Sequence, residues 1–225
     1  MRTCFITGTD TGVGKTRAAC ALIRHLATSG RRVAGFKPVA SGCERTPSGL
    51  RNEDALAMMA VANVELPYAT VNPVALEPAI APHIAAAQAG QAIDPQRIAQ
   101  VAAGIDADHL VVEGAGGWCV PLGPGLMFAD LARLLTEQVI LVVGLRLGCI
   151  NHALLSARQI QRDGLRLAGW IANEIDPGMP VREENFEALL ERLEAPLLAR
   201  IPWQSNATGT DLDQIAWRRE ALSVV

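Results

Sequence analysis

A glycine-rich loop joins a short apolar run to a helical pattern near the start of this chain. Residues 3–7, TCFIT, have the length and composition of a buried strand. They are followed by GTDTGVGKT, residues 8–16, and residues 16–29 then show helical periodicity that ends at Gly30. A strand that turns through glycines directly into a helix begins a βα unit, so this stretch predicts an α/β fold.

The end of the loop matches the phosphate-binding pattern G-x-x-x-x-G-K-[ST]. Gly14, Lys15 and Thr16 fill its last positions, but Thr9 stands where the first glycine belongs and Gly8 comes one residue early. Backbone N–H groups and the helix dipole would surround phosphates here. Lys15 would reach the β- and γ-phosphates, and Thr16 would bind Mg²⁺. The alternative is an ordinary glycine-rich turn, but the motif and its context together favour nucleotide binding.

The rest of the chain alternates apolar runs with helical patterns. Strands are predicted at residues 31–39, 109–114, 138–144, 165–174 and 196–203, and helices at residues 52–61, 94–103, 128–137, 151–164 and 182–193. This alternation implies a mostly parallel central sheet flanked by helices, in three layers. Strands this apolar should be buried on both faces. Because 225 residues suit one sizeable α/β domain and no linker or repeat interrupts them, we expect a single domain over residues 1–225.

Composition restricts the classes of partner. The formal net charge is −3 at pH 7, so nothing indicates binding to nucleic acid or to an acidic membrane surface. The apolar run QVILVVGL, residues 138–145, is far too short to span a bilayer, and the apolar run at the N-terminus is too short for a signal peptide. The five cysteines are odd in number and widely scattered, which indicates reduced thiols in a cytoplasmic protein.

Two acidic residues are candidate Mg²⁺ ligands. Glu113 ends the apolar stretch HLVVE and would lie at the tip of a strand beside the strand of the glycine loop. The glycines of GAGG, residues 114–117, would let the backbone approach phosphates closely. Asp54 lies at a predicted helix start, where the alternative is an acid that only complements the helix dipole. Mg²⁺ prefers few carboxylates together with phosphate oxygens and water, so Thr16, Asp54 and Glu113 form a suitable set.

A polar residue after another predicted strand is a candidate for base recognition. Asn173 can hydrogen-bond both a donor and an acceptor on a purine edge. ANEID, residues 172–176, has the outline of the guanine-reading sequence N-K-x-D, with Glu174 in place of the lysine. The alternative is a polar turn without a ligand. Residues 201–203, IPW, end the next predicted strand and could flank the same base.

Seven stretches taken together resemble the dethiobiotin synthetase family. They run in the same order over about residues 3–205 and are TGTDTGVGKT, GFKPVASG, RNEDA, VEGAGGW, LVVGLRLGCINHALLSA, AGWIANE and IPW. Each is weak alone, but the combination is specific. The resemblance implies an α/β fold built on a phosphate-binding loop, and a homodimer with the diamine site near the subunit interface. It also implies an Mg²⁺-dependent reaction of 7,8-diaminopelargonate, CO₂ and ATP to give dethiobiotin, ADP and phosphate.

The resemblance further implies roles for individual residues. Lys15 and Lys37 are expected to be catalytic, and Thr16, Asp54 and Glu113 to hold the metal. The expected nucleotide-binding positions are Gly12, Val13, Gly14, Lys15, Thr16, Arg17, Asp54, Glu113, Gly114, Ala115, Gly116, Asn173, Glu174, Pro202, Trp203 and Gln204. The expected substrate contacts are Thr11, Ser41 and Asn151, the last reaching the substrate that the partner subunit holds. Family members often have Glu where this chain has Gly12, so one carboxylate contact in the loop is absent.

Lys37 is one of only two lysines among the 20 Lys and Arg residues of the chain, and the other is Lys15. Both fall in motifs expected at the nucleotide. In the implied reaction, negative charge gathers on carbamate and γ-phosphate oxygens, where a compact ammonium fits better than a planar guanidinium. We expect the strand before Lys37 to end next to the strand of the glycine loop, so that Lys37 points at the phosphates. The alternative is a solvated lysine that survives by chance in an arginine-rich chain.

Three other classes of protein share parts of these motifs. Partition-type ATPases have a further lysine five residues before the loop lysine, where this chain has Asp10. A GTPase should have lysine at the position of Glu174. Amidotransferase synthetases with a similar nucleotide domain need a glutaminase extension, for which we expect this chain to be too short. The sequence therefore favours a dethiobiotin synthetase, with a partner-regulated nucleotide switch as the alternative.

Overall fold

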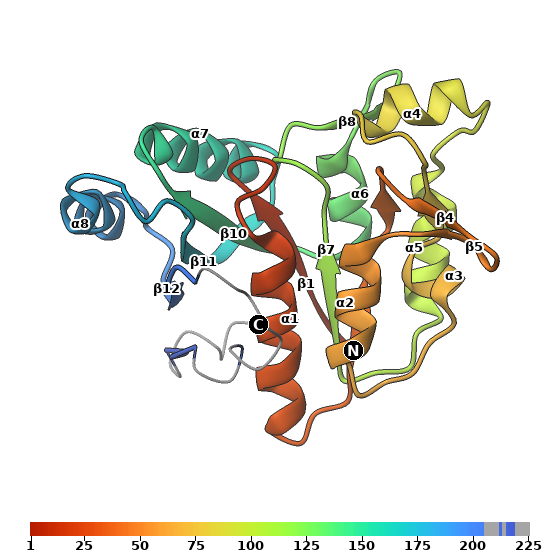
Figure 1. Ribbon diagram of the computed structural model, residues 1–225, viewed down its shortest axis with the longest axis horizontal. Coiled ribbons are helices and arrows are strands. Elements are labelled where there is room, and N and C mark those ends of the chain that lie inside the picture. Colours follow the sequence, from red (N-terminus) through yellow and green to blue (C-terminus); the bar gives the residue numbers. More distant parts are fainter. Residues whose placement is uncertain (205–211, 213–214, 219–225) are drawn as a thin grey trace.

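A central sheet of six strands organises the computed structural model, which describes residues 1–204, 212 and 215–218 (Figure 1). The strand order is β12-β11-β10-β1-β7-β2, and every pairing in it is parallel. The bounds are β1 Arg2–Gly8, β2 Val33–Phe36, β7 His109–Glu113, β10 Gln138–Leu145, β11 Arg166–Glu174 and β12 Leu197–Ile201. The alternation of apolar and helical segments predicts this sheet, and the structure confirms it.

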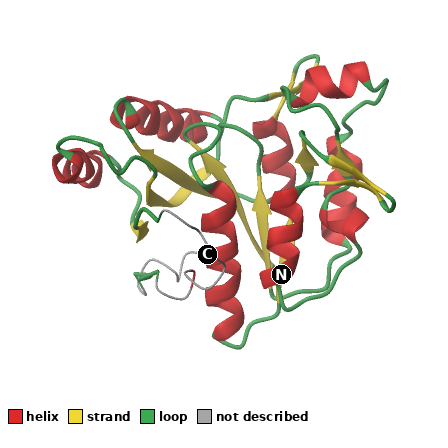
Figure 2. Ribbon diagram, in the orientation of Figure 1, coloured by secondary structure: helices red, strands yellow, loops and turns green. Residues whose placement is uncertain are grey.

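Helices cover both faces of the sheet and make the fold three-layered (Figure 2). Their bounds are α1 Lys15–Thr28, α2 Glu53–Val61, α3 Tyr68–Val71, α4 Pro82–Gln88, α5 Pro95–Ala103, α6 Phe128–Leu135, α7 Cys149–Arg162 and α8 Arg182–Arg192. The buried residues of α1 and α2 pack on one face, and those of α4 to α8 pack on the other. The expected helices all form, with ends within a few residues of the predicted ones.

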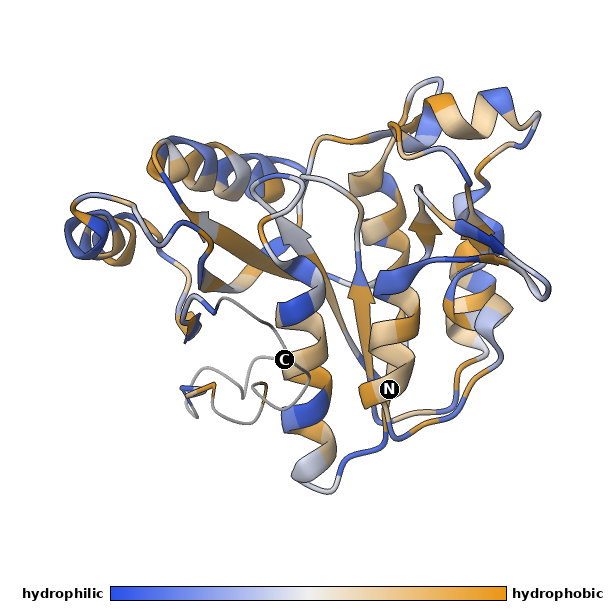
Figure 3. Cartoon of the chain, in the orientation of Figure 1, coloured by the Kyte–Doolittle hydropathy of each residue, from blue (hydrophilic) through white to orange (hydrophobic). Residues whose placement is uncertain are grey.

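Strand β10 shows why the core sequences are so apolar. Ile140 and Val142 belong to the cluster with α1, whereas Val139, Leu141 and Val143 belong to the cluster with α5 to α8. Side chains of a strand alternate between the faces, so a sheet covered on both sides needs apolar residues at nearly every position. Figure 3 shows the central strands coloured as hydrophobic along most of their length.

The strand predicted at residues 31–39 is shorter and interrupted. Strand β2 ends at Phe36, and a separate strand β3, Val39–Ala40, pairs with β6, Val74–Ala75. The break falls at Lys37 and Pro38. The backbone N–H of Lys37 donates to the carbonyl of Val71 in place of a strand neighbour, and Pro38 has no N–H to donate. Lys37 therefore leaves the sheet exactly where β2 stops.

One expectation about topology is wrong. Strand β2 does not end next to β1, because β7 lies between them and pairs with both. The expectation that Glu113 ends a strand beside β1 is confirmed, since β7 pairs directly with β1. Lys37 therefore approaches the glycine loop across the end of β7, and this places it beside Glu113.

Several short elements have no counterpart among the predicted ones. Two hairpins pair β4 Glu44–Thr46 with β5 Gly49–Arg51, and β8 Pro121–Gly123 with β9 Leu126–Met127. Together with the four-residue helix α3 and the seven-residue helix α4, they are too short to show a period in the sequence. Among the described helices, none has the length and apolar character needed to cross a membrane.

Candidate active site

The glycine loop leads from the end of β1 into the first turn of α1, at the edge of the sheet where the parallel strands end (Figure 1). Gly14 is the N-cap of α1 and has a φ of 87°, and Gly12 has a φ of 74°. Both values are left-handed and suit glycine far better than other residues. A Cβ on Gly14 would lie 2.1 Å from Nδ2 of Asn173, whereas a Cβ on Gly12 would meet nothing within 4 Å. The loop thus approaches β11 closely at Gly14 and is open at Gly12.

This difference predicts unequal effects of two alanine substitutions. We expect Gly12→Ala to lower the free energy of unfolding by about 1 kcal/mol, since it adds only backbone strain. Gly14→Ala adds the collision with Asn173 and should cost about 2 kcal/mol or more. Urea unfolding of both variants measures the difference. An equal loss in the two would contradict the close approach of the loop to Asn173.

A hydroxyl, an ammonium and two carboxylates meet beside the first turn of α1. The Thr16 hydroxyl contacts Asp54 Oδ1 at 2.6 Å and Glu113 Oε1 at 2.9 Å. The Lys37 ammonium lies 2.7 Å from Glu113 Oε1 and 2.9 Å from Asp54 Oδ2, and it donates to the Gly114 carbonyl at 3.2 Å. The sequence-predicted metal set and the predicted catalytic lysine therefore form one cluster.

Burial and pairing oppose each other in this cluster. Lys37 is 3% exposed and Glu113 is 1% exposed. Burial works against the charged form of Lys37, but attraction to Glu113 and Asp54 outweighs it and raises the pKa of Lys37. Burial raises the pKa of Glu113, and the neighbouring Lys37 opposes that shift. Burial would raise the pKa of Asp54, but Lys37 and the Thr16 hydroxyl outweigh it, and together they lower the pKa of that carboxyl. Lys37 is thus held charged, and the alternative of a solvated strand-end lysine is wrong.

The donor set fits a hard divalent cation such as Mg²⁺. Glu113 Oε2 is buried and has no hydrogen-bond partner among the described residues, so this carboxylate has an oxygen free to bind. The Thr16 hydroxyl and the Asp54 carboxylate lie within hydrogen-bond distance of each other. The described part of the chain has no cluster of three or more His, Cys, Asp and Glu side chains suited to a metal. Two carboxylates and a hydroxyl match Mg²⁺, which takes few protein ligands and completes its shell with phosphate oxygens and water.

Lys15 lies in the first turn of α1 and folds back over the loop. Its ammonium donates to the carbonyl of Asp10 at 3.0 Å. Burial, and then repulsion from Lys37, lower the pKa of Lys15 from 10.5 to about 8. An added anion beside Lys15 would oppose both effects. The loop is also fixed at Asp10, whose carboxylate pairs with Arg146.

A cavity of about 780 Å³ joins the loop to this cluster. Its lining includes Lys15, Thr16, Lys37, Asp54 and Glu113, together with residues 79–82 and 120–121. Six further expected residues also line it, namely Thr11, Gly12, Gly14, Ser41, Ala115 and Gly116. Ser41 Oγ is buried and has no hydrogen-bond partner among the described residues, so it is free to bind a ligand. The segment 79–82 was not expected from the sequence, because it lies in an irregular connection without a motif.

The residues expected at the base lie on the other side of the loop. Asn173 is buried at 3% exposure, donates from Nδ2 to the Val13 carbonyl at 2.8 Å, and has no partner for Oδ1 among the described residues. Glu174 pairs with Arg200 at 2.7 Å and Arg182 at 3.2 Å. Because Glu174 pairs with two arginines, it holds the end of β11 in place, and Asn173 is the residue there that bonds to the loop.

Arg17 connects the first turn of α1 to the segment after β12. Its guanidinium donates to the Pro202 carbonyl at 3.0 Å and to Oε1 of Gln204. Trp203 is 41% exposed, and its backbone N–H points at Glu174 Oε2 at 3.5 Å. Arg17 therefore holds the expected positions 202–204 beside the start of α1. These positions follow β12 and are far from the glycine loop in sequence.

Asn151 stands apart from this cavity within one chain. It lies in the first turn of α7, is exposed, and is absent from the cavity lining. The single chain therefore does not bring Asn151 to the other expected substrate contacts.

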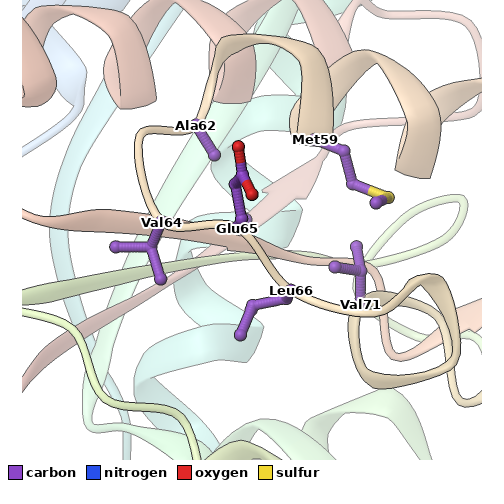
Figure 4. A pocket seen from close by; sticks show the side chains of 7 residues that line it. Met59, Ala62, Val64, Glu65, Leu66 and Val71 are labelled. Atoms are coloured by element: carbon purple, nitrogen blue, oxygen red, sulfur yellow. The ribbon is translucent and has the colours of Figure 1, made fainter.

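A second, smaller cavity of about 230 Å³ lies at the edge strand β2 (Figure 4). It is lined by Met59, Ala62, Val64, Glu65, Leu66 and Val71, with Gly35. None of the residues expected at a functional site lines it. Its lining is apolar apart from Glu65, so it offers no set of polar groups for the chemistry described above.

Comparisons with known proteins agree with these features. A family model described as an AAA domain matches residues 2–210. In solved structures, MinD in the MinC:MinD cell division complex of Aquifex aeolicus has a TM-score of 0.59 at 18% identity, covering 91% of this chain and 83% of that one. The signal recognition particle receptor FtsY of Elizabethkingia anophelis, in complex with GDP, has a TM-score of 0.58 at 15% identity, covering 99% of this chain and 62% of that one. At these identities the likeness shows a shared fold only.

Two curated relatives are much more similar in sequence. The ATP-dependent dethiobiotin synthetase BioD of Xanthomonas oryzae pv. oryzae (strain PXO99A) is 52% identical over 205 residues, which is 90% of this chain and 92% of the relative. The enzyme of the same name from Pseudomonas paraeruginosa (strain DSM 24068 / PA7) is 52% identical over 206 residues, or 90% of each chain. The chain therefore belongs to the family of ATP-dependent dethiobiotin synthetases.

Proposed function

We propose that this chain closes a cyclic urea on 7,8-diaminopelargonate, using CO₂ and ATP and releasing dethiobiotin, ADP and phosphate. Family membership supports an ATP-dependent ligase of biotin biosynthesis. The observation that carries the proposal is the convergence of Lys15, Thr16, Lys37, Asp54 and Glu113 at one cavity of about 780 Å³. A partner-regulated switch is not favoured, because the position that holds the extra lysine in partition-type ATPases is Asp10, which here pairs with Arg146.

The reaction divides into three bond-forming steps. One substrate amine attacks CO₂ and loses a proton, which gives a carbamate. A carbamate oxygen then attacks the γ-phosphorus, the bond from phosphorus to the ADP oxygen breaks, and a carbamic–phosphoric anhydride forms. Finally the second amine attacks the carbonyl carbon, loses a proton and expels phosphate, which closes the ring. Negative charge therefore passes through the carbamate and the γ-phosphoryl oxygens, where preorganised cations stabilise the transition state.

Lys37 and Lys15 would stabilise this charge from two sides. Lys37 is held charged at the cavity by Glu113 and Asp54, and we assign it to the carbamate and the γ-phosphoryl group. Lys15, at the start of α1, would contact the β- and γ-phosphates, whose charge would favour the ammonium against the burial that lowers its pKa. The backbone N–H groups around Gly12, Val13 and Gly14, and those of Ala115 and Gly116, would surround the phosphates, whereas the N–H of Gly114 donates to the Ile6 carbonyl.

Mg²⁺ would be held by Thr16, Asp54 and Glu113, the set whose oxygens meet in the cluster. When bound, it supplies charge neutralisation on the phosphate oxygens. Ser41, with its unpartnered hydroxyl at the cavity, and Thr11 would contact the diamine substrate. This division assigns the carboxylates to the cation and the hydroxyls of residues 11 and 41 to the substrate.

The base of ATP would lie between the end of β11 and residues 202–204. Asn173 Oδ1, which has no hydrogen-bond partner among the described residues, could accept from an adenine amino group. Pro202 and Trp203 would flank the ring, with Gln204 beside them. Arg17 ties this segment to α1 through Pro202 and Gln204, and Glu174 would hold the end of β11 through its arginine pairs.

A homodimer would complete the substrate site. Asn151 is exposed at the first turn of α7 and lies outside its own cavity lining, so we place it at the substrate of the partner subunit. Apolar side chains around it support an interface, since Leu147 is 89% exposed and Leu155 is 58% exposed. The five cysteines are all free, which suits the cytoplasm, where we place the protein.

Mixing two inactive variants tests the shared site. We expect Asn151→Ala and Lys37→Ala each to be nearly inactive alone, and their mixture to recover activity once subunits exchange. Each mixed dimer then has one site free of both lesions. Size-exclusion chromatography with tagged subunits shows that mixed dimers form. If they form without recovery, Asn151 serves its own chain and the interface assignment is wrong; capping is not the alternative, because the N-cap of α7 is Gly148 and no side chain caps it.

The proposed function is tested by an assay with the diamine, bicarbonate, Mg²⁺ and ATP that follows ADP and the cyclic urea together. We expect the two products in equal amounts, and almost no ADP when the diamine is omitted. ATP turnover that does not depend on the diamine would contradict the proposal and favour a nucleotide switch.

A further inference from the structure

Two side chains of the α3 segment link the backbone of Lys37 to the start of α2. Asn72 donates from Nδ2 to the Lys37 carbonyl at 2.6 Å and to the Val74 carbonyl at 3.3 Å. Its Oδ1 accepts from the Tyr68 hydroxyl at 3.0 Å. The same hydroxyl accepts from the backbone N–H of Asn52 at 2.7 Å. A continuous path of hydrogen bonds therefore runs from Lys37 to the residue that caps α2.

This path and the Lys37–Asp54 ion pair form a closed ring. Asn52 is the N-cap of α2, and its side chain accepts from the backbone N–H of Ala55. Asp54 follows Asn52 by two residues and pairs with the Lys37 ammonium at 2.9 Å. If α2 moved relative to Lys37, either the ion pair or the link through Tyr68 and Asn72 would have to break. This closed set of contacts thus fixes the spacing between the Lys37 ammonium and the Asp54 carboxylate.

The hydrogen-bonding capacity of Asn72 is used almost completely by this link. Asn72 is 3% exposed, both donors of its amide have carbonyl partners, and its oxygen accepts from a hydroxyl. Leaving such buried groups unpaired costs about 1–3 kcal/mol. Any other position of the segment would incur that cost, so the network favours one arrangement.

A cavity beside the segment leaves part of its apolar surface without close contacts. Leu66 and Val71, which flank Tyr68 in sequence, line the cavity of about 230 Å³ at the edge strand (Figure 4). A cavity lacks the close contacts that fix a well-packed element. The position of the Lys37 backbone, which also donates to the Val71 carbonyl, therefore depends on the polar link as well as on the packing of Leu66 and Val71.

We propose that Tyr68 and Asn72 are positioning residues that act through Lys37 and Asp54. Neither lines the 780 Å³ cavity, so neither would touch ATP or the diamine. Their effect is on the placement of the ammonium, and small errors in the placement of a charged group cost large factors in rate. The inference rests on the catalytic role proposed for Lys37.

Two variants remove the link by different means. Tyr68→Phe removes only the hydroxyl and keeps the aromatic side chain, whose ring centroid lies 4.2 Å from Cζ of Arg51. Asn72→Ala removes both the donors and the acceptor. We expect each to lower kcat about tenfold, with KM for ATP changed by less than about twofold, because neither side chain lines the cavity. Leu66→Ala is the matched control: it loosens the same segment without removing a polar link, and it should lower Tm but leave kcat near the wild-type value.

A second readout reports on Lys37 independently of turnover. The chain has only two lysines, so lysine labelled with ¹³C at Cε and ¹⁵N at Nζ gives two side-chain signals, which Lys37→Arg assigns. We expect the Lys37 signal of the free protein to shift in Tyr68→Phe and Asn72→Ala, and to stay in place in Leu66→Ala. The Lys15 signal should move little in all three. A shifted Lys37 signal supports the positioning role even if dethiobiotin is not the product.

Two outcomes would overturn the inference. One is a Lys37 signal and a kcat that both remain at wild-type values in folded Tyr68→Phe. The other is an equal loss of kcat in Leu66→Ala at the same Tm as the network variants, which would show that general loosening of the segment accounts for the effect.

Discussion

Lys37→Arg is expected to turn over at least about tenfold more slowly than the wild type, a loss of about 1.4 kcal/mol of transition-state stabilisation, even though the charge is kept. The ammonium of Lys37 has three donors and three acceptors around it, namely Glu113 at 2.7 Å, Asp54 at 2.9 Å and the Gly114 carbonyl at 3.2 Å. A guanidinium is wider and planar, so it cannot keep these three contacts at the same distances without moving a carboxylate.

Comparing Lys37→Arg with Lys15→Ala distinguishes an effect on the rate of the reaction from an effect on ATP binding. Lys37→Arg should keep most of its affinity for ATP, measured by calorimetry, whereas Lys15→Ala should lose affinity as well as turnover. Thermal unfolding of both variants shows whether they are folded. Turnover near the wild-type rate in Lys37→Arg would refute the requirement for a compact ammonium at this position.

Glu113→Gln is expected to raise the Mg²⁺ concentration needed for half-maximal activity by about tenfold or more, and Asp54→Asn to have the same direction of effect. The amides keep the shape of the side chains but remove the charge that a divalent cation needs. Glu113 should have the larger effect, because it is 1% exposed and one of its oxygens has no hydrogen-bond partner in the described part of the chain. Activity measured against Mg²⁺ at fixed ATP gives the result.

Glu53→Gln is the control for Asp54. Both acids lie in the first turn of α2 and both complement its dipole, but Asp54 is the one that contacts Thr16 and Lys37. We expect Glu53→Gln to shift the Mg²⁺ response much less than Asp54→Asn. If Asp54→Asn titrates like the wild type, Asp54 acts only on the helix.

Much of the fold is predictable from sequence because its core strands are buried on both faces. Strands β7, β10 and β11 are buried at nearly every position and carry apolar runs in their middle, and the helices between them show a clear period. The strand order is less accessible, since no local pattern tells that β7 inserts between β1 and β2. For this reason the sequence predicts incorrectly that the strand before Lys37 ends next to β1. It does place Lys37 at the candidate site.

The candidate site is predictable where a motif fixes the backbone, and not where it depends on contacts between distant segments. The loop sequence predicts Lys15 and Thr16, and strand ends predict Glu113 and Asn173. In contrast, Tyr68 and Asn72 lie around a four-residue helix without a recognisable pattern. Their link to Lys37 spans 35 residues from Asn72, so only the folded chain reveals it.

The most direct test of the account follows the oxygen atoms of CO₂. In the proposed reaction a carbamate oxygen attacks the γ-phosphorus and later leaves with the phosphate. If C¹⁸O₂ is added with the diamine, Mg²⁺ and ATP, and the reaction is stopped before CO₂ exchanges with water, mass spectrometry should find one ¹⁸O in each phosphate and one in each cyclic urea. Phosphate that instead takes its new oxygen from the solvent would show that the protein hydrolyses ATP without activating a carbamate, and it would contradict the proposed function.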